Sequence, residues 1–215
     1  MPEVIINGPE GRLEGRFMPA EDKTAPIALI LHPEPDKGGN MNNRVSFALY
    51  RKFQHYGFSV LRFNFRGVGR SQGQFNHGEG ELADAATALD WVQAQCPNAQ
   101  NCWVAGFSFG AWIGMQLMMR RPEIINFIAV TPPAGEQDFS FLAPCPASGM
   151  IIHGEADSMV PPEAVRRMVD KMPRQRGITL DLRFIPDANH FFTSHLDQLM
   201  DETDDYLQKA ASNAA

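Results

Sequence analysis

The residues with the clearest chemical pattern lie at 103–112, in the string WVAGFSFGAW, which contains Gly106-x-Ser108-x-Gly110 between an apolar run and a helical pattern. A serine on a sharp strand-to-helix turn needs small residues two positions before and two positions after it, because the bend crowds them. Such a turn presents the hydroxyl above the carboxyl-terminal edge of a sheet. It also directs the N–H of Phe109 towards the same point, at the positive end of a helix. The spacing therefore predicts Ser108 as a nucleophile.

A second copy of the pattern, GRSQG at residues 69–73, shows that the spacing alone is not specific. This copy lies several residues beyond its expected strand and leads into a polar loop instead of a helix. We therefore interpret Ser71 as part of a turn-rich loop. The overlapping G-x-G at 67–69 does not complete a dinucleotide-binding pattern, because Gln72 occupies the position of the third glycine.

A serine nucleophile needs a base, and the base needs an orienting carboxylate, which follow in the order serine, acid, histidine in this architecture. The apolar run 150–153 opens into a loop that carries two acids, Glu155 and Asp157. Asp157 is the better candidate because it lies further past the strand, where the loop can turn back towards the serine. Glu155 is more simply a solvated loop residue. The alternative for Asp157 is a capping role for the helix that begins near Pro161.

The candidate base is His190, which follows the last apolar run in the string PDANHFF and is the one histidine of six in such a position. His195 is expected at the start of the last helix, and His153 at the end of a strand as a structural residue. The sequence has no H-E-x-x-H or comparable ligand spacing, so we expect neither a metal site nor another cofactor. Ser108, Asp157 and His190 form the predicted catalytic triad.

The loop HPEP at 32–35 could supply part of an oxyanion hole. Pro33 and Pro35 have no backbone N–H, so Glu34 is the one residue between them that can donate from its backbone. The two prolines also stiffen the loop, which would preorganise that donor. Taken alone, the string fits an ordinary proline-rich connection. Together with the glycine-serine turn, it predicts Glu34 and Phe109 as the two oxyanion donors.

Short apolar runs alternate with stretches of helical period, which indicates an α/β fold with a largely parallel sheet flanked by helices. We expect strands at 4–6, 13–17, 27–32, 58–65, 102–107, 124–130, 150–153 and 179–185. We expect helices around 45–56, 82–92, 109–120, 162–172 and 196–207. The first two strands have no helix between them and should form an antiparallel edge. No composition shift marks a second domain, so we expect one domain over 1–215 with a frayed tail at 210–215.

The composition excludes several classes of protein. The 215 residues are 44% hydrophobic, which is enough to bury a core and argues against disorder. A net charge of −6 argues against affinity for nucleic acid or an anionic membrane. We expect no membrane span and no signal peptide. The three cysteines lack a C-x-x-C pair, which favours a cytoplasmic protein with free thiols. The sequence leaves open whether the protein forms a homodimer.

The HPEP loop, the glycine-serine turn, the acid and the histidine, in this order along the chain, resemble the α/β-hydrolase superfamily. The chain is similar to the small, lidless bacterial serine hydrolases and carboxylesterases allied to the dienelactone hydrolase branch. The resemblance extends from about residue 4 to residue 207 and includes GNMNN at 39–43, LRFNFRGVGRS at 61–71, LDWV at 89–92 and NHFF at 189–192.

The resemblance implies that Ser108 is the nucleophile, Asp157 the acid and His190 the base, with Glu34 and Phe109 as the oxyanion donors. The sequence departs from the family in two ways. Dienelactone hydrolases proper use a cysteine nucleophile, and relatives often have a second histidine where Glu34 stands. If the Glu34 carboxylate faces the pocket, it should disfavour anionic substrates.

The predicted reaction is hydrolysis of short-chain carboxylic esters through an acyl-enzyme, without a cofactor. The segment between the expected strands at 124–130 and 150–153, with Phe139, Phe141 and Leu142, could wall a pocket but is too short for a helical cap. An uncapped site favours small, accessible acyl groups. Thioesters, lactones and activated amides are alternatives on the same fold. A non-catalytic binding protein that kept the fold is the alternative from another class, although the complete triad favours an enzyme.

Overall fold

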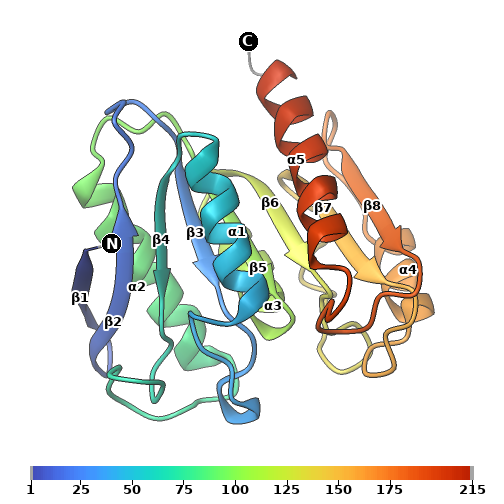
Figure 1. Cartoon of the computed structure of the whole chain (residues 1–215), viewed down its shortest axis with the longest axis horizontal. Helices are drawn as coiled ribbons and strands as arrows, with labels where there is room; N and C mark the ends of the chain where they lie inside the picture. The colour runs from blue at the N-terminus through green and yellow to red at the C-terminus, as the bar shows by residue number, and fades with distance from the viewer. Residues whose placement is uncertain (1, 214–215) are drawn as a thin grey trace.

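The computed structural model describes residues 2–213 of the chain. Its centre is an eight-stranded sheet in the order β1-β2-β4-β3-β5-β6-β7-β8 (Figure 1). The strands are β1 (Glu3–Gly8), β2 (Gly11–Met18), β3 (Ile27–Leu31), β4 (Ser59–Phe63), β5 (Cys102–Phe107), β6 (Ile124–Val130), β7 (Ser148–Gly154) and β8 (Leu180–Ile185). The helices are α1 (Arg44–His55), α2 (Glu79–Gln95), α3 (Phe109–Met118), α4 (Pro162–Asp170) and α5 (Leu196–Asn213), with a short 3-10 turn, η1, at Pro35–Lys37.

The sheet is antiparallel at one edge and parallel elsewhere. β1 pairs antiparallel with β2, and β2 with β4, which confirms the predicted antiparallel edge. All strands from β4 to β8 run parallel. Their carboxyl ends therefore share one edge of the sheet, the lower edge in Figure 1. The loops that carry the predicted site residues all leave from this edge.

Helices cover both faces of the sheet because parallel strands need long crossover connections. Helices α1 and α5 cover one face, where residues such as Leu49 and Leu199 pack against Ile30 and Ile152. Helices α2, α3 and α4 cover the other face and build a second apolar cluster (Figure 1). With apolar contacts on both sides, the central strands β3, β4 and β5 are buried along their whole length.

Several predicted boundaries differ from the observed ones by a few residues, and the end of the last helix differs most. Helix α5 runs to Asn213, whereas residues 210–215 were expected to form a frayed tail. An ion pair between Lys209 and Asp205, one helical turn apart, supports the last turns, and alanine is the best helix former. Residues 214 and 215 lie outside the described part. Within residues 2–213, no helix is both long and apolar enough to cross a membrane, and Cys96, Cys102 and Cys145 are unpaired.

Candidate active site

Ser108 lies on the turn between β5 and α3, in a backbone conformation that is rare for a residue with a side chain. Its φ and ψ angles are 53° and −118°. A Cβ atom on Gly106 would lie 2.3 Å from the carbonyl oxygen of Gly110, and a Cβ on Gly110 would lie 2.4 Å from the carbonyl oxygen of Leu31. Both approaches are to backbone atoms, which cannot move without changing the turn. The two glycines are therefore required by the geometry that presents Ser108.

The predicted acid and base form a hydrogen-bonded pair. The Nδ1 atom of His190 lies 2.8 Å from Oδ2 of Asp157. The other carboxylate oxygen of Asp157 accepts hydrogen bonds from the N–H groups of Met159 and Val160, at 2.8 and 2.9 Å. Burial by itself raises the pKa of Asp157, but the hydrogen bonds from His190 and Val160 outweigh it and leave the pKa below its ordinary value. An ionised Asp157 holds a proton on Nδ1 of His190 and leaves Nε2 as an acceptor.

The loops that carry these two residues are attached to each other directly. The N–H of Ala156 donates to the carbonyl of Ala188 at 3.0 Å. A Cβ on Gly154 would lie 2.2 Å from that same carbonyl oxygen, so the contact requires glycine at the end of β7. The Asn189 side chain accepts hydrogen bonds from the N–H groups two and four residues further on, at 3.2 and 3.1 Å, and so closes the turn that holds His190.

The two predicted oxyanion donors are backbone N–H groups without a hydrogen-bond partner in the described part of the chain. Within residues 2–213, neither the N–H of Glu34 nor that of Phe109 has a hydrogen-bond acceptor. The start of α3 lies against the end of β3, because a Cβ on Gly110 would be 2.4 Å from the carbonyl oxygen of Leu31 and 2.5 Å from that of His32. The loop with Glu34 and the first turn of α3 are therefore neighbours.

His32 fixes the start of that loop. Its Nε2 atom accepts a hydrogen bond from the N–H of Phe65 at 3.0 Å, so its proton is on Nδ1, which donates to the carbonyl of Pro33 at 2.6 Å. Burial lowers the pKa of His32 to about 4, although the bond to Pro33 acts in the opposite direction. The ring is therefore a neutral, buried support for the loop that carries Glu34.

Ser108, His190 and Glu34 line one small pocket of about 100 Å³. Asp157 is buried behind His190. The carboxylate of Glu34 lies 2.8 Å from the ammonium of Lys37, which in turn lies 3.8 Å from the carboxylate of Glu136. The negative charge expected from Glu34 is thus partly neutralised. The remaining lining residues are Pro33, Gly38, Gly39, Asn43, Met159, Val160 and Phe191.

The segment between β6 and β7 contributes less to this pocket than we predicted. It forms no α-helix and no strand among its residues 131–147, in keeping with an uncapped site. Phe139 and Phe141 stack on each other and pack, with Leu142, against the core beneath α3 instead of lining the pocket. Glu136 is the residue of this segment that reaches it. The indole of Trp112 anchors the segment by donating to the carbonyl of Asp138 at 3.0 Å.

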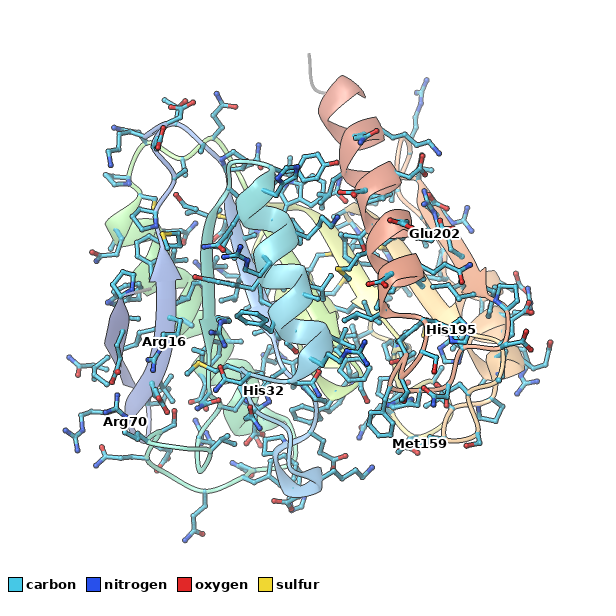
Figure 2. All side chains as sticks on the ribbon, viewed as in Figure 1. Arg16, His32, Arg70, Met159, His195 and Glu202 are labelled. Atoms are coloured by element: carbon cyan, nitrogen blue, oxygen red, sulfur yellow. The ribbon has the colours of Figure 1, made fainter. Side chains whose placement is uncertain are left out.

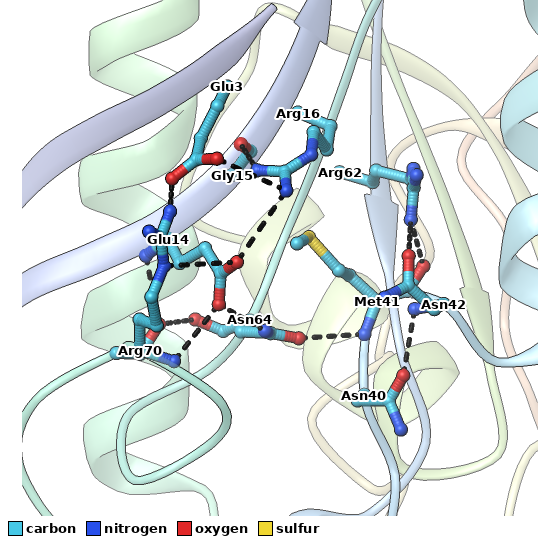
Figure 3. A network of polar contacts seen from close by, with 11 residues as sticks. Glu3, Glu14, Gly15, Arg16, Asn40, Met41, Asn42, Arg62, Asn64 and Arg70 are labelled. Atoms are coloured by element: carbon cyan, nitrogen blue, oxygen red, sulfur yellow. Dashed lines mark hydrogen bonds and ion pairs between the residues drawn. The ribbon is translucent and has the colours of Figure 1, made fainter. Parts of the chain in front are cut away.

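Two polar residues that our sequence analysis missed hold the pocket wall, Gly38–Asn43, in place (Figure 3). The N–H of Met41 donates to the side chain of Asn64 at 2.8 Å, and its carbonyl accepts from Arg62 at 2.7 Å. Both side chains come from β4 or its end and are buried. The sequence could have indicated their role, because polar residues are unusual within the otherwise apolar run 58–65. On the far side of this wall lies a separate polar cleft of about 610 Å³.

Ser71, the serine of the second glycine-serine-glycine string, has a structural role. Its hydroxyl accepts a hydrogen bond from the N–H of Glu14 at 2.9 Å and donates to the carbonyl of Asn64 at 2.7 Å. Its side chain thereby joins β2 to the end of β4. The interpretation of Ser71 as a loop residue is confirmed.

The other candidates lie beside the site or away from it. His153 is buried, its Nε2 lies 2.9 Å from the carbonyl oxygen of Val160, and burial lowers its pKa. Glu155 is exposed and pairs with Arg166. Among residues 2–213, no group of three or more His, Cys, Asp or Glu side chains is placed to hold a metal ion.

Comparisons with known proteins identify the family of this chain. The model of the X-Pro dipeptidyl-peptidase (S15) family matches residues 16–139, more than half of the chain, and that of the prolyl oligopeptidase family matches residues 136–213. An uncharacterized protein of Rickettsia prowazekii is 49% identical over 99% of this chain and 91% of its own length.

Two solved structures are also similar. A protein of unknown function from Agrobacterium tumefaciens, described as a candidate alpha/beta hydrolase, is 57% identical with a TM-score of 0.96, over 99% of this chain and 97% of its own. An alpha/beta serine hydrolase without a lid from Xanthomonas campestris is 36% identical with a TM-score of 0.83, over 93% of this chain and 89% of its own.

Proposed function

Because the chain belongs to the α/β-hydrolase superfamily of serine hydrolases, we propose that it is a carboxylesterase that hydrolyses short-chain esters through an acyl-enzyme. His190 takes the proton of Ser108 as the hydroxyl oxygen attacks the ester carbonyl. The N–H groups of Glu34 and Phe109 stabilise the oxyanion that develops. His190 then protonates the leaving alcohol, and Asp157 holds the imidazole and stabilises its cation. Water, activated by His190, releases the acid in the second half of the reaction.

The observation that carries this proposal is the 2.8 Å bond between Nδ1 of His190 and Asp157, with His190 facing the pocket that Ser108 also lines. This bond places the lone pair of Nε2 on the side of the ring away from Asp157, as a general base requires. The two N–H groups without acceptors add the second part of an acyl-transfer site. Removing one such donor typically lowers turnover by about 10²–10³-fold.

The volume of the pocket supports a short acyl group. A pocket of about 100 Å³, with no helical cap above it, favours a small acyl group. A long acyl chain would have to extend out of the pocket over the surface. Acetyl, propionyl and butyryl esters are therefore the expected substrates.

A second candidate is hydrolysis of a peptide or another activated acyl compound, because the two matching family models both describe peptidases. The same acyl-enzyme would serve amides, thioesters and lactones. The nature of the leaving group separates these activities, since an amine must be protonated before it can leave, whereas a nitrophenolate needs no proton. Aminoacyl p-nitroanilides, short acyl thioesters and a lactone therefore belong in the first substrate panel.

The test is hydrolysis of p-nitrophenyl esters of increasing acyl length by the wild type, Ser108→Ala and the matched control Ser71→Ala. We expect activity to fall with acyl length and to drop by about 10⁶-fold in Ser108→Ala. Ser71→Ala should retain activity, at some cost in stability. Activity on the anilides but not the esters would favour the peptidase. No activity on any substrate, with Ser108 unlabelled by a fluorophosphonate, would favour a binding protein.

A further inference from the structure

Two exposed apolar side chains line the same pocket as the predicted base. Met159 is 41% exposed and Phe191 is 53% exposed, and both line the pocket of Ser108. Met159 is at the lower edge of the molecule in Figure 2, where the loop after β7 ends. The other exposed large apolar residues within the described part of the chain do not line this pocket; they are Ile5, Phe47 and Ile125. We call Met159 and Phe191 the apolar rim.

The catalytic machinery itself holds the rim in position. The N–H of Met159 donates to the Asp157 carboxylate at 2.8 Å, so its backbone is fixed by the predicted acid. The ring of Phe191 packs edge-to-face on the His190 ring, with centroids 5.1 Å apart, and on Phe107 at 6.4 Å. Burying apolar surface against a ligand is favourable, and exposed apolar residues at a pocket can mark where a ligand binds. Here two such surfaces are fixed next to the base.

Other residues that line the pocket are charged. Glu34, Lys37 and Glu136 line it and form a chain of ion pairs. The charged lining residues come from the loops after β3 and β6, whereas the apolar rim comes from the loops after β7 and β8. The lining thus offers charged and apolar contacts from different loops, which favours a substrate with both a polar and an apolar part.

The chemistry of acylation determines which part of an ester lies on which side. The carbonyl oxygen must point to the N–H groups of Glu34 and Phe109, while the alcohol oxygen must lie close to His190 to receive its proton. The alcohol substituent therefore leaves on the His190 side. We propose that Met159 and Phe191 bind the alcohol part of the ester, and that the natural substrates are esters of a short acid with an apolar alkyl or aryl alcohol.

This inference rests on the proposed esterase activity and predicts which step of the reaction the apolar rim affects. In acylation the bond from Ser108 to the acyl carbon forms, the bond from that carbon to the alcohol oxygen breaks, and His190 donates a proton to the departing oxygen. The alcohol is absent from the second step, in which water attacks the acyl-enzyme. The apolar rim therefore acts on acylation, which kcat/KM reports, and not on deacylation.

The experiment measures hydrolysis of methyl, butyl and benzyl acetate by pH-stat titration, which needs no chromogenic leaving group. The variants are Phe191→Ala, Met159→Ala and Phe191→Leu, with Ile125→Ala as a matched control because its side chain is exposed at the opposite edge of the sheet. In the wild type, kcat/KM should rise about fourfold for each methylene that the rim covers. In Phe191→Ala, the ratio of kcat/KM for benzyl acetate to that for methyl acetate should fall by about tenfold.

The inference is supported if Phe191→Ala loses its selectivity for benzyl over methyl acetate, measured as the ratio of the two kcat/KM values. Phe191→Leu should then have a ratio between those of Phe191→Ala and the wild type, and Ile125→Ala should have the wild-type ratio. The loss should be larger in kcat/KM than in kcat, because all three esters give the same acetyl-enzyme. An equal loss for methyl and benzyl acetate, together with a changed pH profile, would mean that Phe191 only supports His190 and would overturn the inference. Unchanged selectivity would also overturn it. If the wild type hydrolyses no ester, the proposed function itself fails, which is a separate outcome.

Discussion

Replacing Asp157 by asparagine should trap His190 in the wrong tautomer, because the carboxylate of Asp157 is held from two sides. One of its oxygens accepts hydrogen bonds from the N–H groups of Met159 and Val160, at 2.8 and 2.9 Å. An asparagine must keep its carbonyl oxygen at that position, since its NH₂ group would otherwise face two donors. The NH₂ group must then face Nδ1 of His190, where the carboxylate oxygen now lies at 2.8 Å.

An imidazole that accepts at Nδ1 carries its proton on Nε2. That nitrogen faces the pocket, so the base for Ser108 is lost although the geometry is kept. In a serine protease triad the equivalent change lowers turnover by about 10⁴-fold, and we expect an effect of this order for Asp157→Asn. A 10⁴-fold loss corresponds to roughly 5–6 kcal/mol of transition-state stabilisation. Most of this energy should appear in kcat.

The assay is steady-state hydrolysis of p-nitrophenyl acetate, combined with ¹⁵N NMR of the histidine ring nitrogens. The matched control is Glu155→Gln, which removes the other acid of the same loop; Glu155 is exposed and should be dispensable. Asp157→Asn should remain folded, with the proton of His190 on Nε2. Retention of more than about a tenth of wild-type kcat by Asp157→Asn, or a comparable loss in Glu155→Gln, would refute the reasoning.

Three further predictions concern the supports of the site. Gly106→Ala places a Cβ 2.3 Å from the carbonyl oxygen of Gly110, so we expect about 1–3 kcal/mol of destabilisation in urea unfolding and little labelling by a fluorophosphonate. Glu34→Gln releases Lys37 from its 2.8 Å ion pair, so kcat/KM for an anionic hemisuccinate ester should rise several-fold relative to a neutral ester; no change would show that the carboxylate does not act on substrates. The third prediction concerns pH. Burial lowers the pKa of His32 in the folded state from 6.5 to about 4, so the unfolded chain binds a proton more readily between these pH values. The free energy of unfolding is therefore highest above pH 6.5 and decreases as the pH falls towards 4. The loss is about 3 kcal/mol, and His32→Gln should flatten the dependence of unfolding free energy on pH across that range.

Much of the fold could be predicted because the sequence patterns of its separate strands, helices and turns all indicate the same fold. The strand β5 has the predicted ends, and α3 begins where expected, because the turn at Ser108 allows only glycine two residues away on each side. Asp157 and His190 could be placed from their positions after two apolar runs. The carboxyl ends of parallel strands share one edge, so residues distant in sequence are brought together there.

Other features depend on contacts between elements, which a linear pattern does not contain. Arg62 and Asn64 form hydrogen bonds with the backbone of Met41 and so join the end of β4 to the pocket wall at Gly38–Asn43. These two segments are neighbours only because of the strand order in the sheet. The ion pairs of Lys37 with Glu34 and Glu136 likewise join two loops. The aromatic residues at 139 and 141 could have walled the pocket, but they pack against the apolar core instead.

The strand order also bears on how the molecule avoids self-association. Strands β1 and β8 form the two ends of the sheet within residues 2–213, and an end strand offers unpaired backbone groups to any passing chain. On β8, Asp181 and Arg183 stand two positions apart, and the guanidinium of Arg183 is held by Asp181, Glu202 and Asp205. A strand from another copy that paired with β8 would lie beside these charged side chains and would have to remove water from them, which costs free energy. Charge placed on the terminal strand thus protects the sheet against growing into an aggregate.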